Sequence, residues 1–203
     1  MGKIKTIIFD LGNVLIKFDH TIAARRLSKK SPYNTEEIRD FIFDSNIVAR
    51  YETGRIKTRD FFLKLKSLLK LDISYPELRK IWNEIFYANP PVEKLIKKLK
   101  GKYRLILLSN INYSHFIYLK KRFPILKEFD HIILSYRVGF RKPHPLIYRK
   151  AIELSGCLPQ EILYIDDRED LVKSAQELGI NAFSFKGISD LKKNLEKFGI
   201  DSL

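Results

Sequence analysis

Short apolar runs alternate with amphipathic segments over most of the chain. The run from Thr6 to Phe9 is apolar, β-branched and aromatic, which is typical of a strand buried on both faces of a parallel sheet. Similar runs predict further strands at residues 104–108, 130–134, 162–165 and 181–185. Apolar residues at helical spacing predict helices near residues 92–100, 113–122, 145–155, 170–178 and 188–198. Alternation of this kind predicts βαβ units and a mainly parallel sheet.

A long helical stretch interrupts the alternation directly after the first strand. Residues 20–88 have a helical pattern throughout, and Asn34 followed by Glu37 predicts a capping box within it. We predict four or five helices and no strand there, ending at the run Asn89-Pro-Pro. An insertion at this point is expected to lie over the carboxyl edge of the sheet as a lid. The predicted core comprises residues 1–18 and 89–203, and the predicted cap comprises residues 19–88.

A carboxylate ends the first predicted strand. Asp10 follows Phe9 directly, at the carboxyl end where open α/β sheets bind their ligands. Gly12, two residues later, permits a tight backbone turn around Asp10. On its own this pattern favours an Asp that initiates a turn through its side chain. The other strand ends decide between the two interpretations.

Polar groups follow three other predicted strands. Ser109 and Asn110 offer a hydroxyl and backbone N–H groups to an anion, although alone they favour a helix cap. Lys142 lies in a loop restricted by two prolines, where a lysine is usually only solvated. Asp166 and Asp167 follow a buried strand, and adjacent carboxylates there repel one another unless a cation binds. Because parallel strands end at the same edge, these groups are expected to converge.

Composition and charge narrow the class of protein. The chain has 203 residues and is 45% hydrophobic and 31% charged, as in an ordinary globular protein. Its single cysteine, Cys157, excludes an intramolecular disulfide and a thiolate metal cluster. No signal peptide and no apolar run near the ~20 residues of a membrane span is present, so a cytoplasmic location and no membrane partner are expected.

The net charge of +14 raises the question of nucleic acid. The basic residues are spread over the chain in groups that fit solvated helix faces, and no zinc-finger or RNA-recognition motif is present. A positive field that favours small anionic substrates explains the charge better than a nucleic-acid partner does.

Together these segments resemble one family, the haloacid dehalogenase-like hydrolases. The resemblance spans essentially the whole chain and depends on four motifs in order. They are Phe9-Asp-Leu-Gly-Asn-Val-Leu15, Leu108-Ser-Asn110, Arg141-Lys-Pro143 with Tyr148, and Ile165-Asp-Asp167. It implies an α/β fold with a Rossmann-like parallel sheet and an inserted α-helical cap. Within the family, the residues of the motifs are most similar to those of bacterial sugar-phosphate phosphatases, such as those acting on glucose 1-phosphate.

The resemblance implies a role for each motif residue. Asp10 would attack phosphorus and form an aspartyl-phosphate, which divides one difficult displacement into two easier ones. Phosphate would be held by Ser109, the Asn110 N–H and Lys142, with Lys142 and Ser109 counted with Asp10 as catalytic. Mg²⁺ would be held by Asp10, the Gly12 carbonyl, Asp167 and Asp166, since oxygen ligands shared with phosphate suit this ion. The implied partner is a small phosphorylated metabolite.

The pattern departs from the family at Gly12. Most phosphatases of the family have an Asp there as general acid and base, and such catalysis is worth ~10²–10⁴ in rate. The sugar-phosphatase groups that the chain most resembles also carry Gly. We therefore expect either an easier leaving group, such as that of a sugar 1-phosphate, or an acid recruited from the lid. Asp19 and His20 are the nearest candidates in the sequence.

The sequence leaves two other functions open. Asp10 could displace halide from a 2-haloacid without a metal, but paired Asp166 and Asp167 argue against metal-free chemistry. A non-catalytic binding scaffold is the other alternative, against which the intact Asp10 and Lys142 argue. The predicted function is Mg²⁺-dependent hydrolysis of a small organic phosphate monoester, with sugar phosphates among the candidates. The sequence does not indicate the oligomeric state.

The predicted lid has one polar cluster of interest. Tyr51 and Glu52 precede Gly54 and lie between Arg50 and Arg55. They are expected either to present polar groups to the mouth of the site or merely to end a helix, and the sequence favours neither interpretation.

Overall fold

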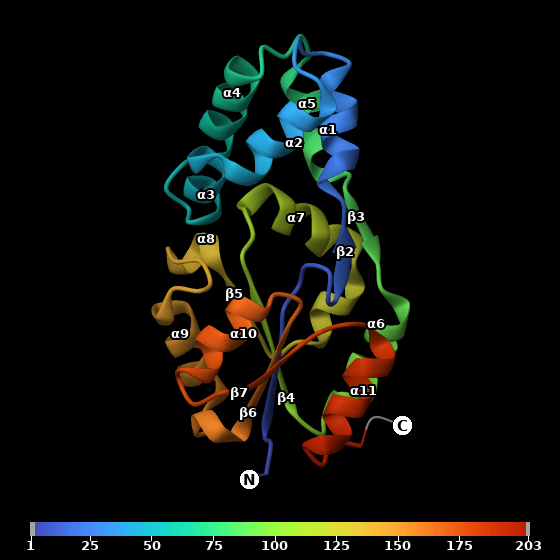
Figure 1. Cartoon of the computed structure of the whole chain (residues 1–203), viewed down its shortest axis with the longest axis vertical. Helices are drawn as coiled ribbons and strands as arrows, with labels where there is room; N and C mark the ends of the chain where they lie inside the picture. The colour runs from blue at the N-terminus through green and yellow to red at the C-terminus, as the bar shows by residue number, and fades with distance from the viewer. Residues whose placement is uncertain (1–2, 202–203) are drawn as a thin grey trace.

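Five short strands form a parallel sheet at the centre of the core (Figure 1). The computed structural model describes residues 3–201. The strand order is β5-β4-β1-β6-β7, so β1 is central, and Phe9 lies beside Leu107 on one side and Ile165 on the other. The strands are β1 (Thr6–Phe9), β4 (Arg104–Ser109), β5 (His131–Leu134), β6 (Ile162–Asp166) and β7 (Asn181–Ser184). The predicted parallel α/β sheet is therefore confirmed.

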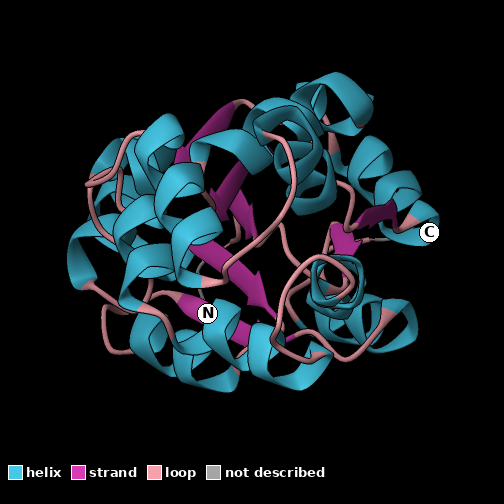
Figure 2. Ribbon diagram, turned by 90° about the horizontal axis from the view of Figure 1, so that it is seen from above, coloured by secondary structure: helices cyan, strands magenta, loops and turns pink. Residues whose placement is uncertain are grey.

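Separate groups of helices cover the two faces of the sheet (Figure 2). Successive side chains of a strand point to opposite faces, so Ile7 and Phe9 pack in one apolar cluster and Ile8 in the other. One face is covered by α6 (Pro90–Leu99), α7 (Tyr113–Arg122) and α11 (Ile188–Lys197). The other face is covered by α9 (Pro145–Ser155) and α10 (Glu169–Gln176). Burial on both faces explains why the strands are continuous apolar runs.

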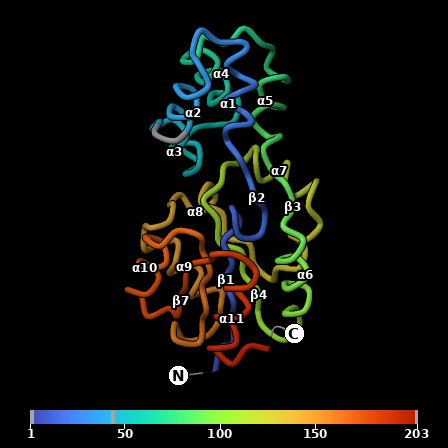
Figure 3. Tube along the Cα trace, turned by 45° about the vertical axis from the view of Figure 1, so that its right-hand side comes forward, coloured from blue at the N-terminus to red at the C-terminus, as the bar shows by residue number. Residues whose placement is uncertain are grey.

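Five further helices form a helical module beyond the carboxyl ends of the strands (Figures 1 and 3). They are α1 (His20–Ser28), α2 (Thr35–Asp44), α3 (Asn46–Glu52), α4 (Thr58–Leu68) and α5 (Tyr75–Asn83). The module packs around an apolar cluster of its own, which includes Phe61, Phe62 and Trp82. The predicted capping box is present, since Asn34 accepts from the Glu37 N–H and the Glu37 carboxylate accepts from the Asn34 N–H.

Two short strands connect the sheet with the helical module. β2 (Ile16–Phe18) pairs antiparallel with β3 (Phe86–Ala88). The prediction that residues 20–88 contain no strand is therefore wrong at its last three residues. The two partners are far apart in the sequence, so the local pattern carries no signal for their pairing. Through this ribbon the chain both enters and leaves the module.

The remaining predicted elements agree with the structure to within a few residues at their ends. Three short elements are not predicted by the pattern: α8 (Ser135–Val138) and the 3₁₀ helices η1 (Pro124–Glu128) and η2 (Pro159–Glu161). Each is a turn or two long, too short for a hydrophobic period to be read. Within residues 3–201, no helix combines the length and apolar character needed to cross a membrane.

Candidate active site

Asp10 and Lys142 meet at the carboxyl end of the central strand. The Asp10 N–H still pairs with the Ile165 carbonyl of β6, which fixes the residue at the end of β1. The Lys142 ammonium lies 2.5 Å from Asp10 Oδ1 and 2.6 Å from Asp166 Oδ2, and it also donates to the Leu108 carbonyl at 3.2 Å. Asp10 is 7% exposed and Lys142 4%. Three segments distant in the sequence thus share one buried ammonium.

Asn110 fixes the position of Lys142 through its backbone. The Asn110 side-chain oxygen accepts from the Lys142 N–H at 2.8 Å, and its Nδ2 donates to the Lys142 carbonyl at 2.9 Å. This double hydrogen bond links the end of β4 to the loop that follows α8. The side chain of Asn110 therefore positions the lysine, a role that the sequence pattern does not indicate.

The paired carboxylates after β6 have different surroundings. Asp166 Oδ2 accepts from Lys142 and from the Tyr164 hydroxyl, and Asp166 Oδ1 accepts from the Arg168 N–H. Asp167 is less buried and accepts from Asn13 Nδ2 at 3.3 Å. Asp166 is thus held by hydrogen bonds on both oxygens, whereas Asp167 keeps more of its lone pairs available.

Burial and like charge raise the pKa values of these carboxyl groups. Burial, together with repulsion from Asp166 and Asp167, raises the pKa of Asp10 to about 7 against the attraction of Lys142. Burial and then Asp166 raise the pKa of Asp167. Burial opposes the charge on Lys142, but Asp10 and Asp166 still raise its pKa, so the ammonium is retained. Three carboxyl groups thus lie around one ammonium, and their mutual repulsion disfavours the charged forms of Asp10 and Asp167.

This cluster of three carboxyl groups fits a divalent cation. One oxygen each from Asp10, Asp166 and Asp167 lie within 4.8 Å of one another. Carboxylate oxygens at one small site, with no nitrogen or sulfur donor among them, suit a hard ion such as Mg²⁺. The donors present therefore fit the metal that the sequence predicts.

A phenylalanine explains the absence of a side chain at position 12. A Cβ atom placed on Gly12 would lie 2.7 Å from Cε1 of Phe18. The Phe18 ring from β2 thus occupies the space next to Gly12 that an acidic side chain would need. Packing against the Phe18 ring therefore favours glycine at this position.

A cavity of about 460 Å³ separates these groups from the helical module. Its floor is formed by residues of the strand ends, including Asp10, Gly12, Ser109, Asn110, Lys142, Asp166 and Asp167. Its upper wall is formed by residues of the module and ribbon, including Phe18, Asp19, His20, Ile42, Val48, Glu52 and Phe86. Such a volume accommodates a small organic molecule. The predicted site residues thus converge on one cavity.

The arrangement of motifs matches a known family. The model of the haloacid dehalogenase-like hydrolases matches residues 4–179 of the chain. The chain belongs to this family. Its members are hydrolases, so the protein is an enzyme of that class.

Two relatives in this family cover nearly the whole chain. D-Ribitol-5-phosphate phosphatase from Bacteroides thetaiotaomicron is 27% identical over 202 residues, covering 95% of this chain and 97% of that protein. A haloacid dehalogenase family enzyme from the same organism has a solved structure that is 30% identical. It superposes with a TM-score of 0.86 and covers 96% of this chain and 99% of that one. In a second structure, that enzyme was crystallised with magnesium and inorganic phosphate, and the match has 32% identity, a TM-score of 0.82 and coverage of 90% and 94%.

A haloacid dehalogenase has the same fold at lower identity. L-2-Haloacid dehalogenase from Xanthobacter autotrophicus is 21% identical with a TM-score of 0.66, covering 98% of this chain and 84% of that one. This likeness concerns the fold, which phosphatases and dehalogenases of the family share.

The two expected acids of the lid are unsuited to proton donation at neutral pH. Asp19 caps α1 by accepting from the Thr21 N–H at 2.8 Å, and this hydrogen bond lowers its pKa. Burial lowers the pKa of His20 to about 4. Both residues line the cavity, but Asp19 is ionised and His20 is neutral near pH 7.

An ion pair joins the helical module to the core at the cavity wall. Glu52, at the end of α3, lies 2.9 Å from Arg141, measured from Oε2 to Nε. Burial raises the pKa of Glu52, and the charge of Arg141 opposes this. The other members of the predicted polar cluster do not share this position. Tyr51 is buried inside the module, and Arg50 and Arg55 are exposed and do not line the cavity.

Sequence reasoning missed several residues of the cavity. The sequence pattern is that of ordinary core positions for four of them, namely Phe18, Ile42, Val48 and Phe86. His115 lies on a helix face with apolar neighbours. The side chain of His115 is held by Asn112 Nδ2 at Nδ1 and by the Trp82 carbonyl at Nε2, each at 3.0 Å. No local pattern distinguishes these residues, because the cavity exists only once the module is placed over the sheet.

Proposed function

We propose that the protein is a Mg²⁺-dependent phosphatase that hydrolyses a small organic phosphate monoester through an aspartyl-phosphate on Asp10. The observation that carries this proposal is the meeting of Asp10, Lys142 and two further carboxylates at the floor of one cavity. The alternatives have less support. Paired acids have no use in metal-free dehalogenation, and a binding scaffold does not need a buried ammonium held beside a nucleophile.

Each residue of the floor has a part in the proposed mechanism. Lys142 holds Oδ1 of Asp10, which leaves Oδ2 to attack phosphorus while the bond to the leaving oxygen breaks. The Ser109 hydroxyl, the Asn110 N–H and Lys142 hold the phosphoryl oxygens and stabilise the charge that develops on them. Water then attacks phosphorus of the aspartyl-phosphate, releases inorganic phosphate and restores Asp10.

The metal would be held by Asp10, the Gly12 carbonyl and the acids after β6. Asp167 is the better placed of these two acids, because both oxygens of Asp166 already accept protein hydrogen bonds. When bound, Mg²⁺ offsets the repulsion between the carboxylates and the incoming phosphate.

The leaving oxygen takes its proton from water in this proposal. Gly12 offers no side chain, Asp19 is ionised, and His20 is neutral near pH 7. Without a positioned acid, the rate is expected to depend on how readily the leaving group departs. Among esters that bind equally well, those of acidic alcohols, phenols or hemiacetals are then hydrolysed faster.

We further propose that residues 19–88 act as a cap domain over a core made of residues 1–18 and 89–203. The separate apolar cluster of the helical module and the two-stranded ribbon that joins it to the core support this division. Among substrates, the similarity to D-ribitol-5-phosphate phosphatase favours phosphorylated sugars and polyols.

Phosphate release from p-nitrophenyl phosphate and from a panel of phosphorylated metabolites tests the function. We expect turnover that needs Mg²⁺ and stops with a chelator. Asp10→Asn is expected to lower the rate at least about a thousand-fold, because it removes the nucleophile. Asp40→Asn, on the exposed face of α2, is the matched control and should leave the rate unchanged. Chelator-resistant halide release from a 2-haloacid, or full activity of Asp10→Asn, would contradict the proposal.

A further inference from the structure

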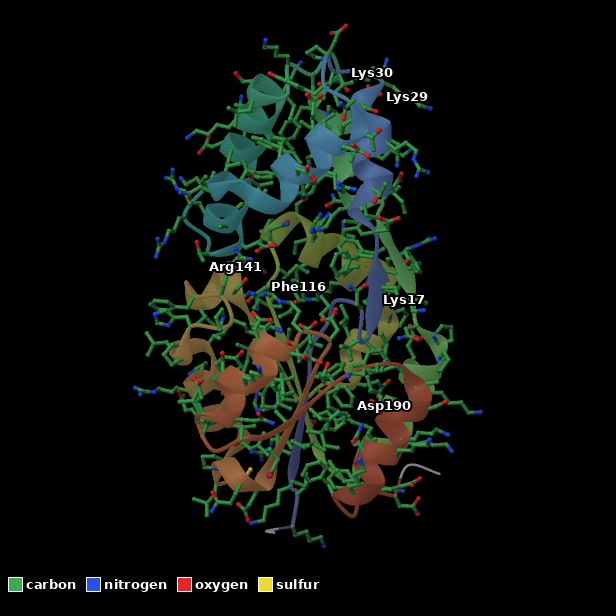
Figure 4. All side chains as sticks on the ribbon, in the orientation of Figure 1. Lys17, Lys29, Lys30, Phe116, Arg141 and Asp190 are labelled. Atoms are coloured by element: carbon green, nitrogen blue, oxygen red, sulfur yellow. The ribbon has the colours of Figure 1, made fainter. Side chains whose placement is uncertain are left out.

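The Glu52–Arg141 ion pair lies at the wall of the cavity that contains the candidate active site. Both residues line the cavity that has Asp10 at its floor. Glu52 comes from α3 of the helical module, and Arg141 precedes Lys142 in the core. Figure 4 shows Arg141 at the level where the module meets the core, next to α8. The side chains of Glu52 and Arg141 are 18% and 36% exposed, so both remain reachable from the cavity.

The position of Glu52 is fixed by two contacts between module and core. The adjacent Tyr51 is 1% exposed, and its hydroxyl accepts from the Ser114 N–H at 3.1 Å. Gly54 lies so close to the core that a Cβ atom there would be 2.4 Å from the Tyr136 carbonyl oxygen. The C-terminal end of α3 is therefore seated against the core on both sides of Glu52. Such a group is preorganised to bind a ligand.

The pair keeps hydrogen-bonding capacity that His115 and Asp19, which also line the cavity, have used. Among the described residues, the buried Nε of Arg141 has no hydrogen bond of acceptable geometry, even though its charge faces Glu52. By contrast, both ring nitrogens of His115 are engaged by Asn112 and Trp82, and Asp19 caps α1. Much of the remaining wall is formed by apolar side chains, those of Phe18, Ile42, Val48 and Phe86.

We propose that Glu52 and Arg141 together bind hydroxyl groups of a neutral leaving group, and so select phosphate esters of sugars or polyols. A carboxylate only accepts hydrogen bonds and a guanidinium only donates them, whereas a hydroxyl does both. One hydroxyl, or two neighbouring ones, can therefore bridge the two side chains. The apolar wall would pack against the C–H face of the same group. This inference rests on the proposed phosphatase function and concerns its specificity.

The same pair disfavours charged leaving groups. A second carboxylate or phosphate on the substrate would be attracted by Arg141 but repelled by Glu52, and an ammonium group would be attracted by Glu52 but repelled by Arg141. Neither charge can therefore bind both side chains favourably, as a hydroxyl can. Aryl phosphates without hydroxyl groups would meet neither repulsion nor a hydrogen bond. We therefore expect the pair to favour esters whose leaving group carries hydroxyls over esters with a charged leaving group and over aryl esters without hydroxyls.

The test compares kcat/KM for three phosphate esters: a pentitol phosphate, p-nitrophenyl phosphate and phosphoglycolate. We expect Glu52→Gln and Arg141→Gln to lower kcat/KM for the pentitol phosphate roughly ten- to a hundred-fold, mainly through KM, because buried polar partners lose a charged hydrogen bond. Activity on p-nitrophenyl phosphate should change less than about three-fold. Glu52→Gln should also improve phosphoglycolate relative to the pentitol phosphate, because the repelling charge is gone.

Glu84→Gln is the matched control. Glu84 pairs with Arg26 at the same distance of 2.9 Å within the helical module but does not line the cavity. It should leave the ratio of the substrates unchanged. Thermal unfolding of each variant shows whether the fold is retained, and Arg141→Gln provides the second measurement if Glu52→Gln fails to fold.

The outcomes separate this inference from the proposed function. Equal losses on the pentitol and aryl phosphates would mean that the pair only fastens the module to the core, and would overturn the inference. Equal turnover of phosphoglycolate and the pentitol phosphate by the unmodified protein would overturn it as well. Absence of phosphate release from every ester would instead reject the phosphatase function itself.

Discussion

The Phe18 ring accounts for the glycine at position 12 of the candidate site. Phe18 lies against Gly12, where it leaves no room for a side chain two residues after Asp10, the proposed nucleophile. The turn that carries Asp10 and the ribbon that leads into the helical module therefore depend on each other at one contact. An acid at position 12 would have to displace this ring before it could reach a leaving group.

We expect Gly12→Ala to destabilise the protein by about 1–3 kcal/mol, because the added methyl group meets the Phe18 ring. In a Phe18→Ala background the same change should cost much less, since the ring is gone. Chemical unfolding of the two single variants and the double variant measures this coupling. An equal cost of Gly12→Ala in both backgrounds would show that the backbone turn, and not the ring, requires glycine.

Contacts between α5 and α7 hold the helical module against the core. Ser114 donates to the Asn83 side chain, and His115 stacks on Trp82 with ring centroids 5.1 Å apart. The imidazole Nε2 must donate to the Trp82 carbonyl, so Nδ1 accepts from Asn112, which is the arrangement of a neutral ring. The junction is therefore built around an uncharged histidine.

This junction makes stability sensitive to acid. Burial lowers the pKa of His115 to about 3, with the nearby His20 adding to the effect. In the unfolded chain, the His115 ring therefore takes up a proton below its ordinary pKa of about 6.5. In the folded protein, the ring stays neutral down to about pH 3. His115 thus contributes stability that is complete above pH ~6.5 and declines as the pH falls through this window.

We expect His115→Gln to lose less stability than the unmodified protein between pH 7 and pH 4.5, by up to about 2.5 kcal/mol. Glutamine is chosen because its amide can still donate to the Trp82 carbonyl. Urea unfolding at the two pH values, with a chelator present, measures the difference. Equal losses in both proteins would show that other groups account for the acid sensitivity.

At the scale of the whole molecule, carboxylate side chains at the ends of β1 and β6 repel one another across the sheet. Their three carboxylates share one ammonium, and burial raises the pKa values of Asp10 and Asp167. A bound cation would link the two strand ends and favour the folded state over the unfolded chain. Stability and metal binding are then coupled across the sheet.

We expect Mg²⁺ at about 100 times its dissociation constant to stabilise the fold by about 2.7 kcal/mol. Thermal unfolding with increasing Mg²⁺ measures this effect independently of activity. Asp167→Asn should remove most of it, whereas Asp170→Asn, in an exposed ion pair with Arg168, should not. With a chelator present, Asp167→Asn should be at least as stable as the unmodified protein, because one repelling charge is gone. An undiminished response to Mg²⁺ in Asp167→Asn would exclude this residue as a ligand.

The sequence by itself determined the sheet, its helices and the residues at the strand ends. Short apolar runs and helical periods are local signals, and parallel strands necessarily bring their carboxyl ends to one edge. Asp10, Ser109 and Asp167 are therefore expected at that edge, and the resemblance to the family's motifs adds Lys142 and the roles of all four residues. The tertiary structure alone decided the β2–β3 ribbon, the Phe18 ring over Gly12 and the pairing of Glu52 with Arg141. Each of these joins segments separated along the chain, and such contacts depend on packing that no local pattern contains.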